Sequence, residues 1–485
     1  MRSRAAALFV IALVTRLPFL TDEFWAHDSV LYARAVEIGF DPADHRPQPP
    51  GYLYYVLLIR LVNTVIADPN RAMTLISAVA AAAAVALLYV LAARMYDQRT
   101  AVLSALFLMT GVTFWGQSLV ALPYTLLGAL TVLVALLLWR AIDPWSDPGP
   151  TPAERGRRLA VASLAWGLAI GFRSDLAGFL APAWLLAALS TTLPWAAASA
   201  AIVGAATLSW LAATVALTPG GADAYFAGLR LHLDFINQRY SVSGRGIDAL
   251  VNNVRELARF MGRALFALIP VLAVVLLSRQ TQRTELRHPR RAAFLLLWAL
   301  APLPVNLLVH AGEYGYMFTM LPGLCVVAAR GTIGAVRAAR MPRALPWIAG
   351  AVIATNAGIF LFSEEPLSRR DVAKRDDGIA EKIALIGRVE PRESVIIVTA
   401  YDQVLLEHYL PGRRRVAYGP DTTPTLELSL SCPASTCVVY AWDEYFRTGA
   451  EWRTVPLPSG ARLRSAEISP GAVLRVRDGL TLEIR

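Results

Sequence analysis

The sequence predicts a polytopic α-helical membrane protein with a small α/β domain after its last apolar segment. Of its 485 residues, 56% are hydrophobic and only 17% are charged, whereas soluble proteins have roughly 25% charged residues. The apolar residues are concentrated in runs of about 15 to 22 residues, a length that crosses a bilayer as a helix. Short loops that carry arginine separate these runs, as is typical of proteins with many membrane crossings.

The candidate helices are runs in which charged residues are rare. They lie at 5–20, 51–67, 72–93, 101–116, 123–140, 159–172, 175–190, 195–217, 263–278, 292–309, 316–329 and 344–362. The run 51–67 differs from the others because it follows two prolines and carries Arg60 and Asn63 in its middle. Both features weaken it as a full crossing, since a charge inside the bilayer is costly.

The distribution of arginine predicts how the chain is oriented, because basic loops of membrane proteins face the cytoplasm. The strongly basic loops, besides the N-terminus, lie at 94–99, 140–158, 279–291 and 330–343. All of them fall on one side only if the run 51–67 does not cross. We therefore expect about 11 transmembrane helices, a juxtamembrane or re-entrant helix at 51–67 on the outer face, and the C-terminal segment outside.

The net charge of +10 comes almost wholly from arginine, because Lys374 and Lys382 are the only lysines. These arginines cluster at the ends of the expected helices, where they orient the chain and contact lipid headgroups. The basic composition therefore predicts membrane lipids as partners and gives no indication of nucleic-acid binding.

Residues 363–485 differ in composition from the rest, because they are charged and contain no further apolar span. Buried strands are predicted at 394–399 and 437–442, with a helix at 402–410 between them. These elements predict a transmembrane domain over 1–362, with its first outer loop at 21–68, and an extracytoplasmic α/β domain over 363–485. The spacing of Cys432 and Cys437 allows a small disulfide loop in an oxidising compartment.

The first outer loop is the candidate active site, because carboxylates and imidazoles at a membrane surface are costly unless they have a function. Asp28 is the foremost catalytic candidate, since a carboxylate there can deprotonate an acceptor hydroxyl. The alternative is that Asp28 caps a helix that begins near Ser29. The neighbouring Asp22 and Glu23 are better explained as solvated residues at the membrane boundary.

Two histidines of this loop, His27 and His45, are candidates for binding a sugar or a phosphate. They could also hold a divalent cation beside Asp28, although no spacing motif for a metal is present. A divalent cation is therefore the one cofactor that the sequence leaves open.

The pattern Asp28-Ser29-x-x-Tyr32-Ala33, followed by His45-x-Pro47-x-Pro49-Pro50-Gly51-Tyr52, resembles the first outer loop of GT-C superfamily membrane glycosyltransferases. These include the protein O-mannosyltransferases and the aminoarabinose transferases of lipid A. The resemblance covers residues 1 to about 330. It implies that Asp28 is the catalytic carboxylate. Tyr32 of this pattern, together with His27 and His45, is a candidate for binding substrate. Ser29 replaces the second acid of the family's Asp-Glu pair, and the outer segment 117–123 has no acid, so the resemblance does not imply a two-carboxylate site.

The resemblance implies an integral-membrane glycosyltransferase that moves a sugar from a polyprenyl-phosphate carrier to an extracytoplasmic acceptor. The sugar is a hexose such as mannose, or a pentose, and the acceptor is a protein, a lipid or a polysaccharide. The expected reaction is an inverting displacement with Asp28 as base, in a bacterial plasma membrane.

Arg173 and Asp175, between the runs 159–172 and 175–190, form a charged pair on the outer side. The simplest interpretation is a turn with a local ion pair. The functional interpretation is that Arg173 stabilises the leaving phosphate while Asp175 orients it. The loop 218–262 offers further arginines and aromatic residues, for which an amphipathic interfacial helix over 224–236 is the simpler account.

The last outer cluster lies between two spans and consists of His310, Glu313, Tyr314 and Tyr316. Boundary solvation and interfacial anchoring would explain these residues, whereas the functional hypothesis is that they recognise the donor sugar.

The main alternative function is a polytopic transporter or a lipid-carrier flippase without transferase activity. Such proteins show repeats and charged, broken helices at mid-membrane. The polar residues here collect on one side instead, which favours an enzyme at the membrane surface.

Overall fold

The computed structural model describes residues 1–142, 150–277, 288–400, 402–417, 427–430, 436–443, 452–469, 473–477 and 480–484. The chain divides into two compact units. The helical unit consists of Met1–Leu20 and Arg34–Arg370. The sheet unit consists of Thr21–Ala33 and Asp371–Arg485, so the segment around Asp28 clusters with the C-terminal part of the chain.

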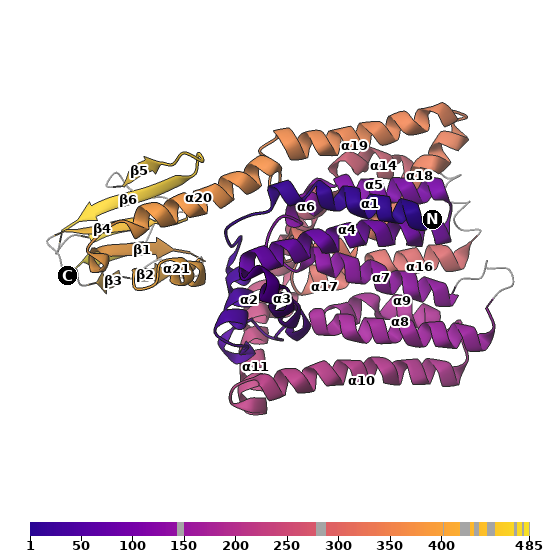
Figure 1. Cartoon of the computed structure of the whole chain (residues 1–485), viewed down its shortest axis with the longest axis horizontal. Helices are drawn as coiled ribbons and strands as arrows, with labels where there is room; N and C mark the ends of the chain where they lie inside the picture. Colours follow the sequence, from indigo (N-terminus) through magenta and orange to yellow (C-terminus); the bar gives the residue numbers. More distant parts are fainter. Residues whose placement is uncertain are drawn as a thin grey trace. The chain divides into compact units, whose positions relative to one another are not determined.

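Helices follow the apolar runs closely, and most of them belong to the helical unit (Figure 1). They are α1 (Arg2–Val14), α2 (His27–Glu37), α3 (Leu53–Ile66), α4 (Pro69–Met95), α5 (Gln98–Thr110), α6 (Val112–Gln117), α7 (Tyr124–Ile142), α8 (Pro152–Phe172), α9 (Leu176–Ala188), α10 (Leu193–Leu217), α11 (Gly221–Tyr240), α12 (Val242–Arg245), α13 (Ile247–Ala264), α14 (Ile269–Leu277), α16 (Pro289–Leu300), α17 (Leu303–Leu308), α18 (Leu321–Ala338) and α19 (Leu345–Phe362). Within the helical unit, α8 packs on α10, and α4 packs on both α7 and α5.

Six described helical segments are long and apolar enough to cross a membrane. They are α4, α7, α10, Pro289–Leu308, α18 and Pro342–Phe362. A seventh results if α13 and the segment after it, bent by 76°, form one span. The chain is thus a multi-pass membrane protein, as predicted, while the expected total of about 11 crossings stays a prediction.

Helix α3 is shorter than a membrane span. Its 14 residues give a length of about 21 Å, whereas the hydrocarbon core of a bilayer is about 30 Å thick. This length agrees with the expected surface helix at 51–67.

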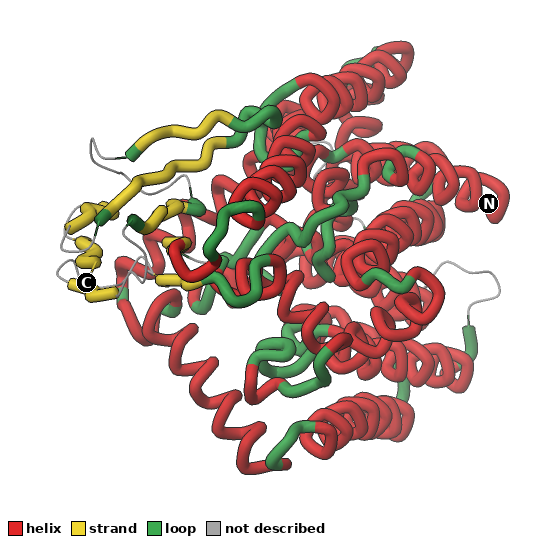
Figure 2. Tube along the Cα trace, turned by 60° about the vertical axis from the view of Figure 1, so that its left-hand side comes forward, coloured by secondary structure: helices red, strands yellow, loops and turns green. Residues whose placement is uncertain are grey.

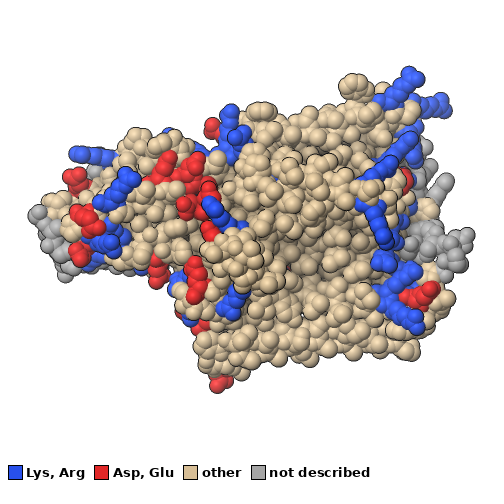
Figure 3. All heavy atoms as spheres, viewed as in Figure 1, with Lys and Arg blue, Asp and Glu red and all other residues tan. Residues whose placement is uncertain are grey.

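Arginines gather at the end of the helical unit where the N-terminus lies, and a broad uncharged surface follows (Figures 1 and 3). Exposed examples at the ends of α5, α7, α8 and α18 are Arg99, Arg140, Arg157 and Arg337. These arginines share one end of the helical unit, whereas most of the predicted basic loop 279–291 lies outside the described residues. That this end faces the cytoplasm stays a prediction.

Helix termini in this unit are fixed by their local sequence. At the start of α4, Asp68 accepts a hydrogen bond from the backbone N–H of Arg71 at 3.1 Å, and Pro69 occupies the first turn. At the start of α8, Thr151 and Glu154 form a reciprocal capping box. Such caps satisfy N–H groups that have no partner inside the helix.

The sheet unit contains the strands of the protein, which Figure 2 shows in yellow. The strands are β1 (Val395–Thr399), β2 (Arg414–Ala417), β3 (Glu427–Leu430), β4 (Cys437–Ala441), β5 (Arg453–Pro456), β6 (Arg462–Ile468), β7 (Val473–Arg477) and β8 (Leu480–Ile484). They form a five-stranded sheet of order β2-β1-β4-β6-β5 and a three-stranded sheet of order β3-β8-β7. Strand β1 is parallel to β2 and β4, and β6 is antiparallel to β4.

Two helices accompany these sheets, α20 (Arg369–Gly387) and α21 (Gln403–Tyr409). The predicted strands at 394–399 and 437–442 correspond to β1 and β4, and the predicted helix at 402–410 corresponds to α21. Cys437 is disulfide-bonded, while Cys432 lies outside the described residues.

Candidate functional site

Asp28 lies in the first turn of α2, one residue after the helix begins at His27. It is therefore inside the helix and does not occupy the capping position that the alternative interpretation assigned to it. A carboxylate in the first turn is favoured by the helix dipole. Asp28 and His27 are half-buried, and Tyr32, one turn later, is buried.

The imidazole of His27 has a buried Nδ1 atom with no hydrogen-bond partner among the described residues. A buried polar nitrogen without a partner is uncommon in folded proteins. His27, Asp28 and Tyr32 all belong to the sheet unit.

Arg173 lies in the helical unit, directly after α8, and only 7% of it is exposed. Its Nε donates to Asp175 Oδ2 at 2.9 Å, which confirms the predicted ion pair. Its guanidinium carbon also lies over two aromatic rings, 4.2 Å from the centroid of Tyr316 and 5.4 Å from that of Tyr124. Ring faces carry partial negative charge and attract the guanidinium.

The protonation of Arg173 is secured by these neighbours. Burial alone lowers the pKa of a guanidinium, but the Asp175 carboxylate and the phenol oxygens of Tyr316, Tyr52 and Tyr124 hold the pKa of Arg173 well above its usual value. The protein thus keeps a full positive charge in a nearly closed environment.

His310 contacts the same group of side chains. Its ring centroid lies 4.2 Å from that of Tyr240 and 6.0 Å from that of Tyr316. Burial and, to a smaller extent, the charge of Arg173 lower the pKa of His310 to about 4. The imidazole is therefore neutral near pH 7 and has one nitrogen that can accept a hydrogen bond.

We call this group the arginine cluster. It consists of Arg173, Asp175, His310, Tyr316, Tyr124 and Tyr240. Four of these residues were predicted as substrate-binding residues. Tyr124 was not predicted, although it directly follows the expected outer segment 117–123. Tyr240 lies in the loop 218–262, whose aromatic residues were not singled out individually.

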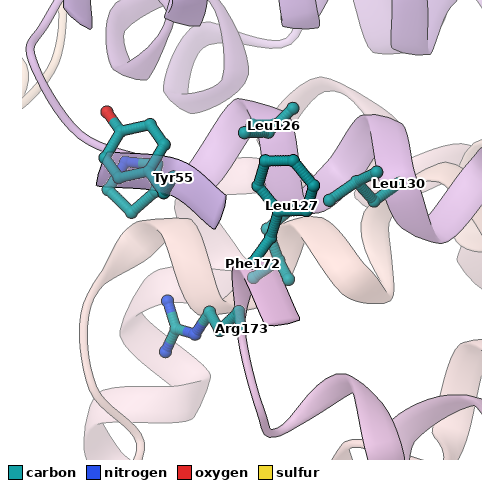
Figure 4. Close-up of a pocket in the computed structure, with 7 residues that line it drawn as sticks. Tyr55, Leu126, Leu127, Leu130, Phe172 and Arg173 are labelled. Carbon is teal, nitrogen blue, oxygen red and sulfur yellow. The ribbon is translucent and has the colours of Figure 1, made fainter. Parts of the chain in front are cut away.

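A small cavity of about 10 Å³ adjoins Arg173 (Figure 4). Its lining consists of Tyr55, Pro123, Leu126, Leu127, Leu130, Phe172 and Arg173. These residues come from α3, the start of α7 and the end of α8. The arginine is therefore bordered by apolar side chains on one side and by the tyrosines of the arginine cluster on the other.

The remaining predicted residues lie in other surroundings. Tyr314 accepts a hydrogen bond from Arg263 of α13, and its ring centroid is 4.5 Å from that of Phe260. Glu313 is exposed at the start of the same 3-10 helix, Tyr314–Thr319. His45 has a left-handed backbone (φ 53°), and its ring lies 6.1 Å from that of His232 on α11.

The loop 218–262 contains three helices, α11, α12 and α13, where one helix over 224–236 was expected. Helix α13 was missed because its apolar residues alternate with arginines and asparagines, so that no apolar run marks it. Its signal in the sequence is helical periodicity, since Ile247, Val251 and Val254 recur along one exposed face.

The described residues do not form a cluster suited to a metal. Among them, no group of three or more His, Cys, Asp or Glu side chains is arranged to hold an ion. Divalent cations generally need several such ligands. The described residues therefore do not fit a resident metal ion.

One family model matches part of the chain. Residues 47–218 match the family model described as dolichyl-phosphate-mannose-protein mannosyltransferase. The comparison with curated protein sequences finds no significant match.

Solved structures share the fold over nearly the whole chain. ArnT from Cupriavidus metallidurans in the apo state superimposes with a TM-score of 0.59 and 11% identity, covering 96% of this chain and 97% of that one. The same protein bound to undecaprenyl phosphate gives 0.57 and 12%, with 96% of each chain covered. The apo oligosaccharyltransferase of Archaeoglobus fulgidus gives 0.50 and 14%, covering 87% of this chain and 65% of that one. At these identities the likeness concerns the fold, and it confirms the predicted fold class.

Proposed function

We propose that this chain, which has the fold of the GT-C superfamily membrane glycosyltransferases, transfers a sugar from a polyprenyl-phosphate carrier to an acceptor outside the cytoplasm. The observation that carries the proposal is the likeness to ArnT bound to undecaprenyl phosphate, which extends over 96% of both chains. The family model that matches residues 47–218 names a polyprenyl-type phosphate sugar as well.

The arginine cluster supports this proposal because it suits a lipid phosphate. A carrier phosphate leaves with a negative charge, and a fixed cation in a desolvated place stabilises that charge strongly. Arg173 is held by Asp175 and by the ring of Tyr316, so the guanidinium does not need to be ordered when the phosphate arrives.

The proposed reaction is a single inverting displacement. Asp28 accepts the proton of the acceptor hydroxyl, and the hydroxyl oxygen forms a bond to the anomeric carbon. The bond between that carbon and the carrier phosphate oxygen breaks at the same time, and the phosphate leaves with the electron pair, stabilised by Arg173. General-base assistance of this kind contributes about 10²- to 10⁴-fold to a rate.

The proposed substrate class is inferred from the similar proteins and not from any single side chain of this chain. A hexose such as mannose agrees with the description of the matching family model, and a pentose is the alternative. The acceptor is a protein, lipid or polysaccharide on the outer face of a bacterial plasma membrane, where the sheet unit also lies in this proposal.

The test is a transfer assay with purified protein in vesicles that contain radiolabelled polyprenyl-phosphate sugars. We expect transfer or donor hydrolysis by the natural chain and a loss of more than about 10²-fold in Asp28→Asn. Glu37→Gln is the matched control, because it removes an exposed acid from the same helix.

Two outcomes of this assay would contradict the proposal. Full activity of Asp28→Asn would exclude Asp28 as the base. Movement of the labelled carrier across the vesicle membrane without any turnover would instead identify a transporter or flippase.

A further inference from the structure

The loop before Asp28 is bound through its backbone to α20 of the sheet unit. Both carboxylate oxygens of Asp376 accept hydrogen bonds from this loop. Oδ2 accepts from the N–H of Asp22 at 2.9 Å, and Oδ1 accepts from the N–H of Glu23 at 2.8 Å. Hydrogen bonds to an ionised acceptor are about twice as strong as bonds between neutral groups.

The next residue of the loop is bound by α21. The hydroxyl of Tyr409 accepts a hydrogen bond from the N–H of Phe24 at 2.9 Å and also bonds to the side chain of Glu23. The ring of Phe24 lies 5.1 Å from His408 and 5.9 Å from Tyr409. Three successive backbone N–H groups therefore donate hydrogen bonds to two side chains that lie more than 350 residues later in the sequence.

A third contact follows immediately in the sequence. The guanidinium carbon of Arg375 lies 4.6 Å from the ring centroid of Trp25. Phe24 and Trp25 are 4% and 8% exposed, so both are buried. The contacts thus extend without interruption from Asp22 to Trp25, and α2 begins two residues later.

This arrangement is unusual for a surface loop, because loop N–H groups are ordinarily satisfied by water or by neighbouring residues. Here the N–H groups of Asp22, Glu23 and Phe24 are each bound by a side chain of the sheet unit, although ordering such a segment costs backbone entropy. A rigidly held segment so close to Asp28 restricts where the first turn of α2 can lie. Accurate placement matters for a catalytic base, because a displacement of about 1 Å can reduce the rate about 100-fold.

We propose that Asp376 and Tyr409 are positioning residues that hold the loop 22–25 and thereby place the Asp28 carboxylate for reaction. The inference rests on the proposed function, since it assigns these residues to the base of that reaction. It gives the sheet unit a part in the chemical step, in addition to any role in acceptor binding.

The test compares Asp376→Asn, Asp376→Ala and Tyr409→Phe in the same vesicle assay. Asparagine retains one acceptor oxygen and alanine retains none, so activity should fall in the order natural chain, Asn, Ala. We expect kcat to fall about 10-fold for Tyr409→Phe and Asp376→Asn, and about 100-fold for Asp376→Ala. The KM for the lipid-linked donor should stay within about twofold, because a positioning defect affects the chemical step.

Hydrogen exchange provides a readout that does not depend on activity. The amides of Asp22, Glu23 and Phe24 should exchange faster in the Asp376 variants, while amides in β1 and β4 keep their protection. Tyr409→Phe should release chiefly the amide of Phe24. Asp377→Asn is the matched control, since it removes the adjacent, exposed acid of α20.

The outcomes separate this inference from the proposed function. If Asp28→Asn abolishes transfer while Asp376→Ala and Tyr409→Phe keep the natural kcat, the positioning role is wrong and the catalytic role of Asp28 stands. If Asp28→Asn itself is fully active, Asp28 is not the base and the positioning role fails with it, whereas absence of transfer by the natural chain would refute the proposed function itself. An equal loss of activity in Asp377→Asn, or a rise in KM alone, would also overturn the positioning role.

Discussion

The two compact units hold their functional candidates in place by different means. In the helical unit, Arg173 is fixed by Asp175, two residues away, and by aromatic rings from other segments. In the sheet unit, the loop before Asp28 is fixed through its backbone by Asp376 and Tyr409. The contacts of Arg173 stabilise a buried positive charge, whereas the contacts of the loop before Asp28 fix the position of its backbone.

The largest effect is expected at Arg173. Arg173→Gln removes the buried cation and leaves the Asp175 carboxylate without its partner, and removal of one such stabilising group costs about 10²- to 10³-fold in rate. Arg173→Lys keeps the charge but loses the planar fork, so it should recover only part of the activity. Transfer rates of the purified variants measure this effect, with exposed Arg230→Gln of α11 as the control. A natural rate in Arg173→Gln would remove the arginine cluster from the reaction.

A smaller effect is expected at Tyr316, whose ring the guanidinium overlies at 4.2 Å. Tyr316→Leu should weaken donor binding about 30-fold, since a desolvated cation–π contact contributes about 2 kcal/mol. Tyr316→Phe retains the ring and should bind the donor almost normally. The KM for the donor measures both, and equal values for Phe and Leu would show that the ring face is unimportant.

The smallest effect concerns the pH dependence of stability. The pKa of His310 is lowered by burial and by Arg173 to about 4, below its usual value of about 6.5. The unfolded chain therefore binds a proton between these pH values that the folded chain does not, so the stability that His310 contributes falls as pH falls from about 6.5 to 4. His310→Gln should flatten the decrease of Tm over this range in detergent. An unchanged pH profile would argue against a neutral, partly buried imidazole.

The features that could be predicted from the sequence are those that depend on residues close together in the chain. The helices followed from apolar runs because burial in lipid demands long apolar segments, and the pair Arg173 and Asp175 followed from a spacing that spans one turn. The strands β1 and β4 were recognised because a strand buried on both faces is a short apolar run.

Features that depend on distant segments could not be predicted in this way. Asp376 lies on a charged helix with several other acids, and nothing in that helix indicates that it binds the loop near Asp28. Helix α13 has too many polar residues to appear as an apolar run. The contact made by Asp376 is a consequence of tertiary packing, which a single sequence does not reveal, whereas α13 is indicated in the sequence by its helical periodicity.

The most direct test of the account is carrier binding, measured side by side for the natural chain, Asp28→Asn and Arg173→Gln. The ligand is a polyprenyl phosphate without sugar, titrated into each purified protein. We expect Asp28→Asn to bind it with a natural Kd although it transfers no sugar, and Arg173→Gln to bind it at least about 10-fold more weakly. Natural binding by Arg173→Gln, together with weakened binding by Asp28→Asn, would contradict the division of roles between the two units.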